Sequence, residues 1–434
     1  MTSPLRIGVL GLGTVGAALV STLQKNANYI ASRAGRPLVV VAVSARDKSR
    51  DRGFDVKDLE WFDDPVALAR SNTIDVLVEL IGGADGTAKE AVEAALASGK
   101  SVVTANKALL AKHGGSLVAS AEKNNVALNF EASVAGGIPI VKTLRESLAG
   151  NHVTRVSGIL NGTCNYILSR MELEGLTFED CLKDAQRLGY AEADPTFDVG
   201  GFDTAHKLSI LTSLAFGTEI DSEAVYVEGI ASIKPLDLVM ADELGYRIKL
   251  LGVAERTSTG IEQRVHPTMV PKHWAIAQVM GVTNAVNVMA DIVGEITLVG
   301  PGAGGNATAS SVLSDLVDIA RGLHVPPLGV SSKTLTQTDQ APMQRHEGGY
   351  YIRLTVRDKP GAAAGIATRM AEQQISLESI VQKRPPASRA ADPAGKAGTP
   401  VPVVLITYAT TEEAIRRALD AVLERRGERQ AIPT

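Results

Sequence analysis

The chain has 434 residues and a mass of 45.5 kDa, which is too long for one ordinary hydrophobic core, so we expect two or three domains. Hydrophobic residues make up 45% and charged residues 21%, a balance that is typical of a globular enzyme and excludes a disordered or fibrous chain. The net charge of -4 and the pI near 6.0 leave no basic surface for nucleic acid or an anionic membrane, so small molecules are the expected partners.

The first part of the chain alternates short apolar segments with helical periodicity. This alternation predicts a doubly wound parallel α/β sheet. We assign it to residues 1–130, as a dinucleotide-binding domain to which a segment near residues 300–322 returns. The expected strands are residues 7–10, 38–43, 76–80, 101–104 and 127–130, and the clearest expected helix is residues 88–97.

The pattern changes after the first domain. Longer helical stretches mixed with strands predict an α+β domain over residues 131–322, and the polar residues 323–349, rich in proline and glycine, predict a linker. Residues 350–434 follow the order of a small βαββαβ unit whose last strand the pattern does not place. Within it, Arg384–Pro402 is expected to be a mobile hairpin loop, because it has too few large apolar residues to fold alone.

A glycine-rich turn directly follows the first expected strand and precedes a helix. Gly11-Leu12-Gly13-Thr14-Val15-Gly16 matches G-x-G-x-x-G in the context that this motif requires. Gly11 permits a tight turn, Gly13 lets the backbone approach a pyrophosphate, and Gly16 allows helix and strand to pack closely. The turn therefore predicts a Rossmann-type dinucleotide site, with a glycine-rich turn that binds nothing as the alternative.

The end of the second expected strand bears on the choice of cofactor. An acidic residue there would accept hydrogen bonds from the ribose of NAD, but the chain has Arg46, Asp47 and Lys48. Arg46 and Lys48 favour NADP(H), because they can bind a 2′-phosphate, whereas Asp47 keeps NAD(H) possible. A solvated run of charges is the alternative interpretation.

Two segments predict the chemistry. Thr104 and Lys107 lie at the carboxyl end of an expected parallel strand, where doubly wound folds bind their ligands. Asp203 and Lys207 are four residues apart at the start of an expected helix, so they share a face and can pair. Partial burial lowers the pKa of a lysine and a nearby carboxylate raises it again, which suits proton transfer. A surface lysine and a plain ion pair are the respective alternatives.

The sequence also predicts the compartment. Cys164 and Cys181 stand in neither a metal-binding nor a CxxC spacing, which fits a reducing environment. The N-terminus runs into a strand without an export signal, and no apolar run is long enough to cross a bilayer. We therefore expect a cytoplasmic protein with no membrane partner.

Besides the glycine-rich turn, five strings in the same order along the chain resemble the homoserine dehydrogenase family. The similarity spans essentially the whole chain, which makes coincidence a poor explanation. The strings are VTANKALLA (Val103–Ala111), EASVAGGIPI (Glu131–Ile140), GILNGTCNYIL (Gly158–Leu168), GYAEADPTFDVGGFDTAHKL (Gly189–Leu208) and GPGAGG (Gly300–Gly305).

The resemblance implies an oxidoreductase that interconverts L-aspartate 4-semialdehyde and L-homoserine in threonine and methionine biosynthesis. It implies that Lys207 donates a proton to the aldehyde oxygen and that Lys107 lies beside the nicotinamide and the reacting carbon. Glu192 and Asp198 would hold the substrate ammonium group, with Asp203 pairing in the same pocket. Hydride attack on an aldehyde leaves an alkoxide, which a cationic lysine can stabilise and protonate.

Further contacts follow from the same resemblance. Gly162 and Thr163 would line the substrate pocket, and Gly302 would close over the cofactor. A sodium ion would be bound by a carboxylate and backbone carbonyls, although an ordinary loop after a strand explains these residues as well. The residues of this expected cation site are Glu131, Val134, Gly136 and Ile138.

The C-terminal unit, from Tyr351 onward, is similar to ACT domains, which sense amino acids. The turn from Asp358 to Gly361 would hold the effector, and the pairing of such modules implies threonine feedback in a homodimer or homotetramer. Residues 131–322 would then serve catalysis and dimerisation. A structural domain that has lost its ligand is the alternative, and the insertion after Arg384 departs from the usual short hairpin of such domains.

Three other functions compete with this one. An aspartate-semialdehyde dehydrogenase needs a catalytic cysteine with a base, and a prephenate dehydrogenase would not explain the lysine and carboxylate segments. A non-catalytic amino-acid sensor that binds a nucleotide has no use for a proton donor. The joint presence of the two lysines with Glu192, Asp198 and Asp203 argues against the sensor, and no cysteine with a base beside it supports the first alternative.

Overall fold

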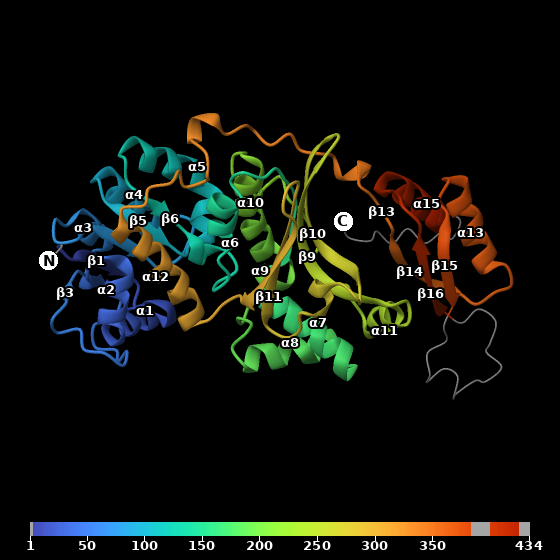
Figure 1. Ribbon diagram of the computed structural model, residues 1–434. Coiled ribbons are helices and arrows are strands. Elements are labelled where there is room, and N and C mark those ends of the chain that lie inside the picture. Colours follow the sequence, from blue (N-terminus) through green and yellow to red (C-terminus); the bar gives the residue numbers. More distant parts are fainter. Residues whose placement is uncertain (1–2, 383–399, 425–434) are drawn as a thin grey trace. The chain divides into compact units, whose positions relative to one another are not determined.

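The computed structural model describes residues 3–382 and 400–424. The chain divides into two compact units (Figure 1). The first unit comprises Met1–Leu238 and Gly245–Gln340, and the second comprises Val239–Leu244 and Ala341–Thr434. Within the described ranges, no helix combines the length and the apolar character that crossing a bilayer requires.

The first unit begins with a six-stranded parallel sheet of order β3-β2-β1-β4-β5-β6, which confirms the predicted Rossmann-type fold. Its central strands are buried on both faces, which explains why they read as continuous apolar runs. The chain order reverses between β1 and β4, so their carboxyl ends open a crevice for a ligand. The strands are β1 (Leu5–Leu10), β2 (Leu38–Ser44), β3 (Glu60–Trp61), β4 (Val76–Glu79), β5 (Ser101–Thr104) and β6 (Leu128–Asn129).

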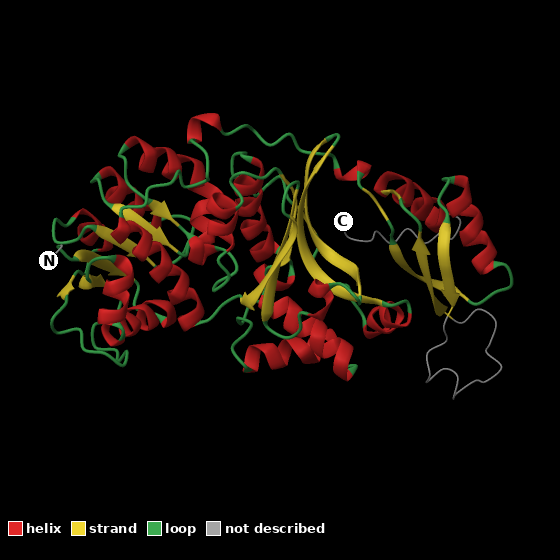
Figure 2. Cartoon of the chain, in the orientation of Figure 1, coloured by secondary structure: helices red, strands yellow, loops and turns green. Residues whose placement is uncertain are grey.

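Helices cover both faces of this sheet (Figure 2). Three of them pack together on one face, where Leu19 and Val20 share a core with Val312 and Leu316 from a segment far along the chain. These three helices are α1 (Thr14–Lys25), α2 (Ala27–Ala34) and α12 (Gly305–Arg321). The other helices of this domain are α3 (Pro65–Arg70), α4 (Thr87–Ala97) and α5 (Lys107–Lys123).

A second six-stranded sheet, of order β12-β11-β7-β9-β10-β8, forms the α+β part of the first unit. All pairs of neighbouring strands in this sheet are antiparallel, except the parallel pair of β8 and β10. Helix α10 packs on β7, β9 and β10, and α7 packs on β9 and β11. The strands are β7 (Val153–Ile159), β8 (Tyr226–Val227), β9 (Tyr246–Thr257), β10 (Gly260–Pro271), β11 (Thr283–Ala290) and β12 (Gly294–Pro301).

Short helices connect the two sheets and flank the second. The connecting segment holds η1 (Glu131–Ser133), α6 (Ile140–Lys142) and η2 (Thr143–Ser147). The flanking helices are α7 (Gly162–Glu174), α8 (Phe178–Arg187), α9 (Thr196–Val199), α10 (Phe202–Phe216), α11 (Pro235–Glu243) and η3 (Ala275–Gln278). The predicted linker region contains the short turns η4 (Ser332–Thr334) and η5 (Met343–Arg345).

The second unit has an antiparallel sheet of order β14-β16-β15, whose apolar side packs on two helices. The predicted order of strand, helix, strand, strand and helix is observed. Pro400–Pro402, expected in a loop, instead begin β16, and the rest of the expected hairpin loop lies outside the described residues. The elements are β13 (Glu347–Gly348), β14 (Tyr351–Arg357), α13 (Ala362–Glu372), β15 (Leu377–Gln382), β16 (Pro400–Thr407), β17 (Thr410–Thr411) and α15 (Glu412–Glu424).

Candidate active site

The glycine-rich turn between β1 and α1 has the shape of a dinucleotide site. Gly11 has φ +91°, and a Cβ there would lie 2.7 Å from the Leu80 carbonyl oxygen. A Cβ on Gly16 would lie 2.0 Å from the Gly11 carbonyl oxygen, so neither position accepts another residue. A Cβ on Gly13 meets nothing within 4 Å, and no side chain caps the helix that begins at Thr14. Open space at uncapped N–H groups fits a pyrophosphate.

The residues at the end of β2 arrange their charges around Trp61. Lys48 Nζ lies 5.6 Å and the Arg52 guanidinium carbon 5.8 Å from the centre of its ring. Asp47 accepts hydrogen bonds from the Ser49 hydroxyl (2.6 Å) and backbone N–H (2.8 Å), which hold the pKa of its carboxyl below the usual value. Arg52, which sequence analysis missed, donates to the Leu12 carbonyl at 3.3 Å and so braces the glycine-rich turn.

The two predicted lysines meet at one carboxylate. Lys207 Nζ lies 2.7 Å from Asp203 Oδ2, and Lys107 Nζ lies 3.1 Å from Asp203 Oδ1. Lys207 comes from α10, whereas Lys107 is the first residue of α5, which follows the parallel strand β5. Lys207 also donates to the Leu160 carbonyl at 2.7 Å, so its ammonium group is held at two points.

Asn161 joins a second carboxylate to this cluster. Its side-chain N–H groups donate to Asp198 (2.8 Å) and to Asp203 (2.9 Å). Burial alone would raise the pKa of Asp203, but the positive charges of Lys207 and Lys107 and the hydrogen bonds outweigh it and hold that pKa well below the usual value. Asp198 lacks such close cations, so burial, helped by the charge of Asp203, raises its pKa.

The other predicted substrate residues lie around this cluster in different ways. Thr163 donates its hydroxyl to the Tyr190 carbonyl at 2.6 Å and so ties the loop before α9 to α7. A Cβ on Gly162 would lie 2.7 Å from the Val282 carbonyl oxygen, so the start of α7 requires glycine. Glu192 is exposed on that loop, and its backbone carbonyl accepts a hydrogen bond from Gln186. The structure therefore brings Asp198 and Asp203 together but leaves the Glu192 side chain at the surface.

Gly302 lies in the connection from β12 to α12. A Cβ there would lie 2.0 Å from Asn284 Cγ, and a Cβ on Gly136 would lie 2.3 Å from the Gly302 carbonyl oxygen. Three segments thus cross here, because Gly136 lies against the backbone of Gly302 and Gly302 lies against the Asn284 side chain. Thr104, the other residue expected near the cofactor, donates its buried hydroxyl to Glu79 Oε2 at 2.6 Å.

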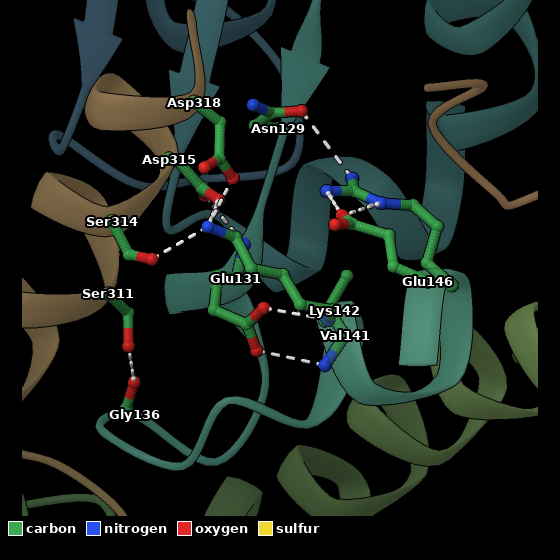
Figure 3. A network of polar contacts seen from close by, with 11 residues as sticks. Asn129, Glu131, Gly136, Val141, Lys142, Glu146, Ser311, Ser314, Asp315 and Asp318 are labelled. Atoms are coloured by element: carbon green, nitrogen blue, oxygen red, sulfur yellow. Dashed lines mark hydrogen bonds and ion pairs between the residues drawn. The ribbon is translucent and has the colours of Figure 1, made fainter. Parts of the chain in front are cut away.

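The expected cation site belongs to a polar network between α6 and α12 (Figure 3). The Glu131 carboxylate accepts backbone N–H groups from Val141 and Lys142, both at 2.8 Å, and thereby caps α6. The Gly136 carbonyl accepts the Ser311 hydroxyl at 2.7 Å, and the Ile138 carbonyl accepts the Ile140 N–H at 2.8 Å. Most of the expected oxygen ligands therefore already accept one hydrogen bond, and only their remaining lone pairs could bind a cation.

Neighbouring acids complete this network. Asp315 accepts the Glu131 N–H at 2.9 Å, and Lys142 forms an ion pair with Asp318. Burial, followed by the charge of Glu131, raises the pKa of Asp315 to about 7. Within the described ranges, no three acidic, histidine or cysteine side chains are grouped as a metal site.

Cys164 does not have the properties of a nucleophile. It is fully buried, and burial together with the charges of Asp198 and Asp203 raises the pKa of its thiol well above the usual value. Chemistry through a thioester therefore has no support at this site.

An open glycine turn and a lysine–carboxylate–lysine cluster, both at the carboxyl ends of a parallel sheet, define a nicotinamide-dependent oxidoreductase. Family models agree: the homoserine dehydrogenase NAD-binding domain matches residues 11–131, and the homoserine dehydrogenase model matches residues 139–317. The chain belongs to the homoserine dehydrogenase family.

Individual relatives are similar over nearly the whole chain. The homoserine dehydrogenase of Neisseria gonorrhoeae is 44% identical over 425 residues, which covers 96% of this chain and 95% of the relative. The crystal structure of a homoserine dehydrogenase from Thiobacillus denitrificans has a TM-score of 0.89 and 43% identity, covering 97% of this chain and 95% of that one. A hyperthermophilic archaeal homoserine dehydrogenase in complex with NADPH has a TM-score of 0.62 and 27% identity, covering 73% and 97%.

Proposed function

We propose that the chain interconverts L-aspartate 4-semialdehyde and L-homoserine, with Lys207 as the group that moves the proton. The observation that carries the proposal is the pair of ammonium groups, 2.7 Å and 3.1 Å from the two oxygens of Asp203. The nicotinamide, when bound, supplies or accepts the hydride. The residues of the chain itself must bind the substrate and move the proton.

Lys207 is suited to stabilise negative charge on the substrate oxygen. Its side chain is 12% exposed, so its charge is weakly screened, and Asp203 and the Leu160 carbonyl fix its direction. In the reductive direction Lys207 donates a proton to the developing alkoxide, and in the oxidative direction it accepts the hydroxyl proton. Lys107 holds the other side of Asp203 and contributes a second positive charge toward the reacting carbon.

The substrate ammonium group needs carboxylates that the lysines do not fully neutralise. Asp198 meets this need, because only Asn161 donates to its side chain among the described contacts. Glu192 lies on the loop that Thr163 tethers through Tyr190, and its assignment to the substrate ammonium group rests on the family resemblance. We therefore assign Gly162 and Thr163 to the same pocket.

The cofactor preference we propose is for NADP(H). Ser49 engages the Asp47 carboxylate, so the end of β2 presents mainly the cations Arg46 and Lys48. The archaeal relative's complex with NADPH supports the same class of cofactor. An Arg46→Ala variant should raise the KM for NADP about 10-fold or more, the scale of losing a hydrogen bond to a charged group, and leave the KM for NAD unchanged.

The second unit is proposed to be an ACT-like regulatory domain over residues 350–434 that binds threonine, in a homodimer or homotetramer. Its order of strands and helices supports this, as does the uncapped start of α13 at Gly361. Inhibition by threonine that weakens in Asp358→Ala would support it, and sedimentation would give the oligomeric state. The other domain boundaries are also proposals. They are residues 1–130 for cofactor binding, 131–322 for catalysis and dimerisation, and 323–349 for the linker.

A bound sodium ion stays a prediction from family resemblance. The test is turnover in sodium chloride against choline chloride at equal ionic strength. Equal rates in both salts would argue against a cation at Glu131.

The test of the main proposal is absorbance at the reduced-nicotinamide band, with homoserine and either NADP or NAD. Lys207→Ala should reduce turnover by about 100-fold or more, the scale of losing a general acid or base. Lys123→Ala, an exposed lysine in α5, is the matched control and should leave turnover unchanged. Absence of turnover with either cofactor would overturn the function, and full turnover in Lys207→Ala would remove Lys207 from the chemistry.

A further inference from the structure

Glu79 is a buried carboxylate beside the active site that neither the motifs nor the mechanism uses. It is the last residue of β4 and is 0% exposed. We propose that Glu79 is a positioning residue for the reaction, because it joins the turn after β4 to the start of α5 and thereby sets the place of Lys107. This inference rests on the role of Lys107 in the proposed function.

Both oxygens of Glu79 are occupied. Oε1 accepts the backbone N–H groups of Ile81 (2.8 Å) and Gly82 (2.9 Å), which lie in the turn after β4. Oε2 accepts the Thr104 hydroxyl at 2.6 Å, at the end of the adjacent strand β5. One side chain thus ties together the carboxyl ends of two neighbouring strands.

The connection continues from Thr104 to the catalytic lysine. Thr104 Oγ1 accepts the Asn106 N–H at 3.0 Å, and Asn106 Oδ1 accepts the Leu109 N–H at 3.1 Å, which caps α5. Asn106 Nδ2 donates back to the Gly83 carbonyl at 2.7 Å, so a second link joins the same two segments. Lys107 follows Asn106 directly, and its ammonium group is the one 3.1 Å from Asp203. We call Glu79, Thr104 and Asn106 the polar frame.

The polar frame also borders the cofactor site. The Leu80 carbonyl, in the turn that Glu79 holds, is the atom that a Cβ on Gly11 would approach to 2.7 Å. The turn after β4 therefore packs directly on the glycine-rich turn. A single rigid frame then relates the cofactor-binding backbone to Lys107.

The energetics favour positioning over simple stabilisation. Burying a carboxylate costs several kcal/mol unless its oxygens are hydrogen-bonded. Among the described contacts Glu79 has three such bonds but no ion pair, and the rest of β4 is apolar. A buried carboxyl group without an ion-pair partner among the described contacts, at the catalytic end of an otherwise apolar strand, is explained if its geometry serves the reaction.

The other end of the same strand provides a matched control. Asp75 precedes β4 and accepts hydrogen bonds from the Arg6 side chain (2.6 and 3.1 Å) and backbone (2.9 Å). This carboxylate also stabilises strand pairing, but at the edge of the sheet opposite to the ligand site. Asp75→Asn should therefore affect stability without affecting turnover.

The informative substitution is Glu79→Gln, which keeps the shape of the side chain. A glutamine has one acceptor and one donor group, whereas the polar frame needs acceptors on both sides. The side-chain NH2 group of the glutamine can face the Ile81 and Gly82 N–H groups, which then lose their acceptor. Alternatively it can face Thr104, whose hydroxyl then loses its acceptor. The first arrangement breaks the two bonds to the turn after β4, and the second reverses the bond to Thr104 and leaves the Thr104 hydroxyl without an acceptor, so either one loosens the start of α5.

The experiment is a double-mutant cycle in the full chain that combines Glu79→Gln with Lys107→Ala. We expect Glu79→Gln alone to lower kcat by about 10- to 100-fold, the scale of a misplaced catalytic group, with the KM for homoserine nearly unchanged. In the Lys107→Ala background the same substitution should have little further effect, because Glu79 acts through Lys107. Thr104→Val should reproduce the kcat effect and serves if Glu79→Gln does not fold, with Thr104→Ser restoring activity.

The outcomes separate the two proposals. Additive losses in the double variant, or a kcat loss in Asp75→Asn as large as in Glu79→Gln, would overturn the role of Glu79 while leaving Lys107 catalytic. Full activity in Lys107→Ala alone would overturn both the role of Lys107 and the inference drawn from it. A kcat loss in Glu79→Gln that disappears in the Lys107→Ala background is the result that supports the polar frame.

Discussion

Charged side chains serve different ends in the two units of the chain. In the first unit, Lys107 and Lys207 converge on Asp203, whose side chain is 6% exposed. In the second, Arg417 pairs with Glu413 one helical turn away, and their side chains are 65% and 50% exposed. Burial keeps the first cluster strong enough to act on a substrate, whereas water screens the second. We therefore place the proposed chemistry in the first unit, and we expect the stability of the second unit to depend on its apolar core.

Removing the shared carboxylate should have the largest effect. Asp203→Asn leaves both lysines without their common partner, and we expect kcat to fall by about 100- to 1000-fold, as for loss of a preorganised electrostatic group. Asp194→Asn, an exposed carboxylate on the preceding loop, is the control. Steady-state kinetics with homoserine measures both, and equal activity in the two variants would contradict the cluster as the reaction centre.

The same substitution predicts a pH dependence of stability. The pKa of Asp203 is depressed in the folded state. The carboxylate therefore contributes to the free energy of unfolding above its unfolded pKa of about 3.9, and this contribution is lost as pH falls through the folded pKa. The difference in unfolding free energy between the chain and Asp203→Asn should thus shrink in strong acid. A difference that stays constant down to acid unfolding would contradict the depressed pKa.

In the second unit the sensitive position is apolar. Leu405 is 0% exposed in the centre of β16, and Leu405→Ala should destabilise this unit by about 2–5 kcal/mol through the cavity it leaves. Hydrogen exchange of peptides from residues 350–424 measures the change, with the exposed Tyr408→Ala as control. Turnover without effector should stay unchanged, since a large loss would mean that the second unit contributes to the reaction itself.

Local patterns explain what could be predicted from the sequence. Within one turn, Gly11 is required by its φ of +91° and Gly16 by its approach to the Gly11 carbonyl, and Asp203 and Lys207 pair because they are four residues apart on one helix. Neither depends on the rest of the fold. The contact between Lys107 and Asp203 does depend on the rest of the fold, because it joins α5, which follows a strand of the first sheet, to α10, which packs on the second sheet. Only the family resemblance therefore suggested a shared site.

The features that sequence analysis missed have no local signature. Glu79 belongs to no motif, and its meaning depends on the strand beside it. Pro400 and Pro402 indicated a loop, because proline cannot donate within a ladder. They are tolerated in β16 because the N–H groups that the two prolines lack would point to the same side of the strand, toward β15. Within the described residues, the pairing of β16 with β15 reaches only to Val403, so no partner there needs these N–H groups.

Lys249 tests what burial does to a charge outside the active site. It is 1% exposed and donates to Asn165 and to the Val279 carbonyl, and burial, followed by the charge of Arg247, lowers its pKa to about 8. The folded pKa lies below the unfolded value, so the cost of the buried charge is present below pH 8 and is relieved as pH rises toward about 10.4.

The chain should therefore gain stability relative to Lys249→Met over that pH range, by on the order of 3 kcal/mol. Urea unfolding followed by tryptophan fluorescence measures this, since both tryptophans, Trp61 and Trp274, lie in the first unit. If the difference between the two proteins does not change with pH, folding does not lower the pKa of Lys249.

The smallest effect is expected at the exposed ion pair of α15. Arg417→Ala should change the stability of the second unit by less than about 0.5 kcal/mol, because a pair one helical turn apart in water gains little. Hydrogen exchange in α15 measures it, with Glu413→Gln as the reciprocal variant. A loss well above about 1 kcal/mol would mean that water does not screen this pair, so this helix face would have to be covered by another molecule in solution. The contrast between a buried catalytic cluster and a screened surface pair would then hold only for the isolated chain.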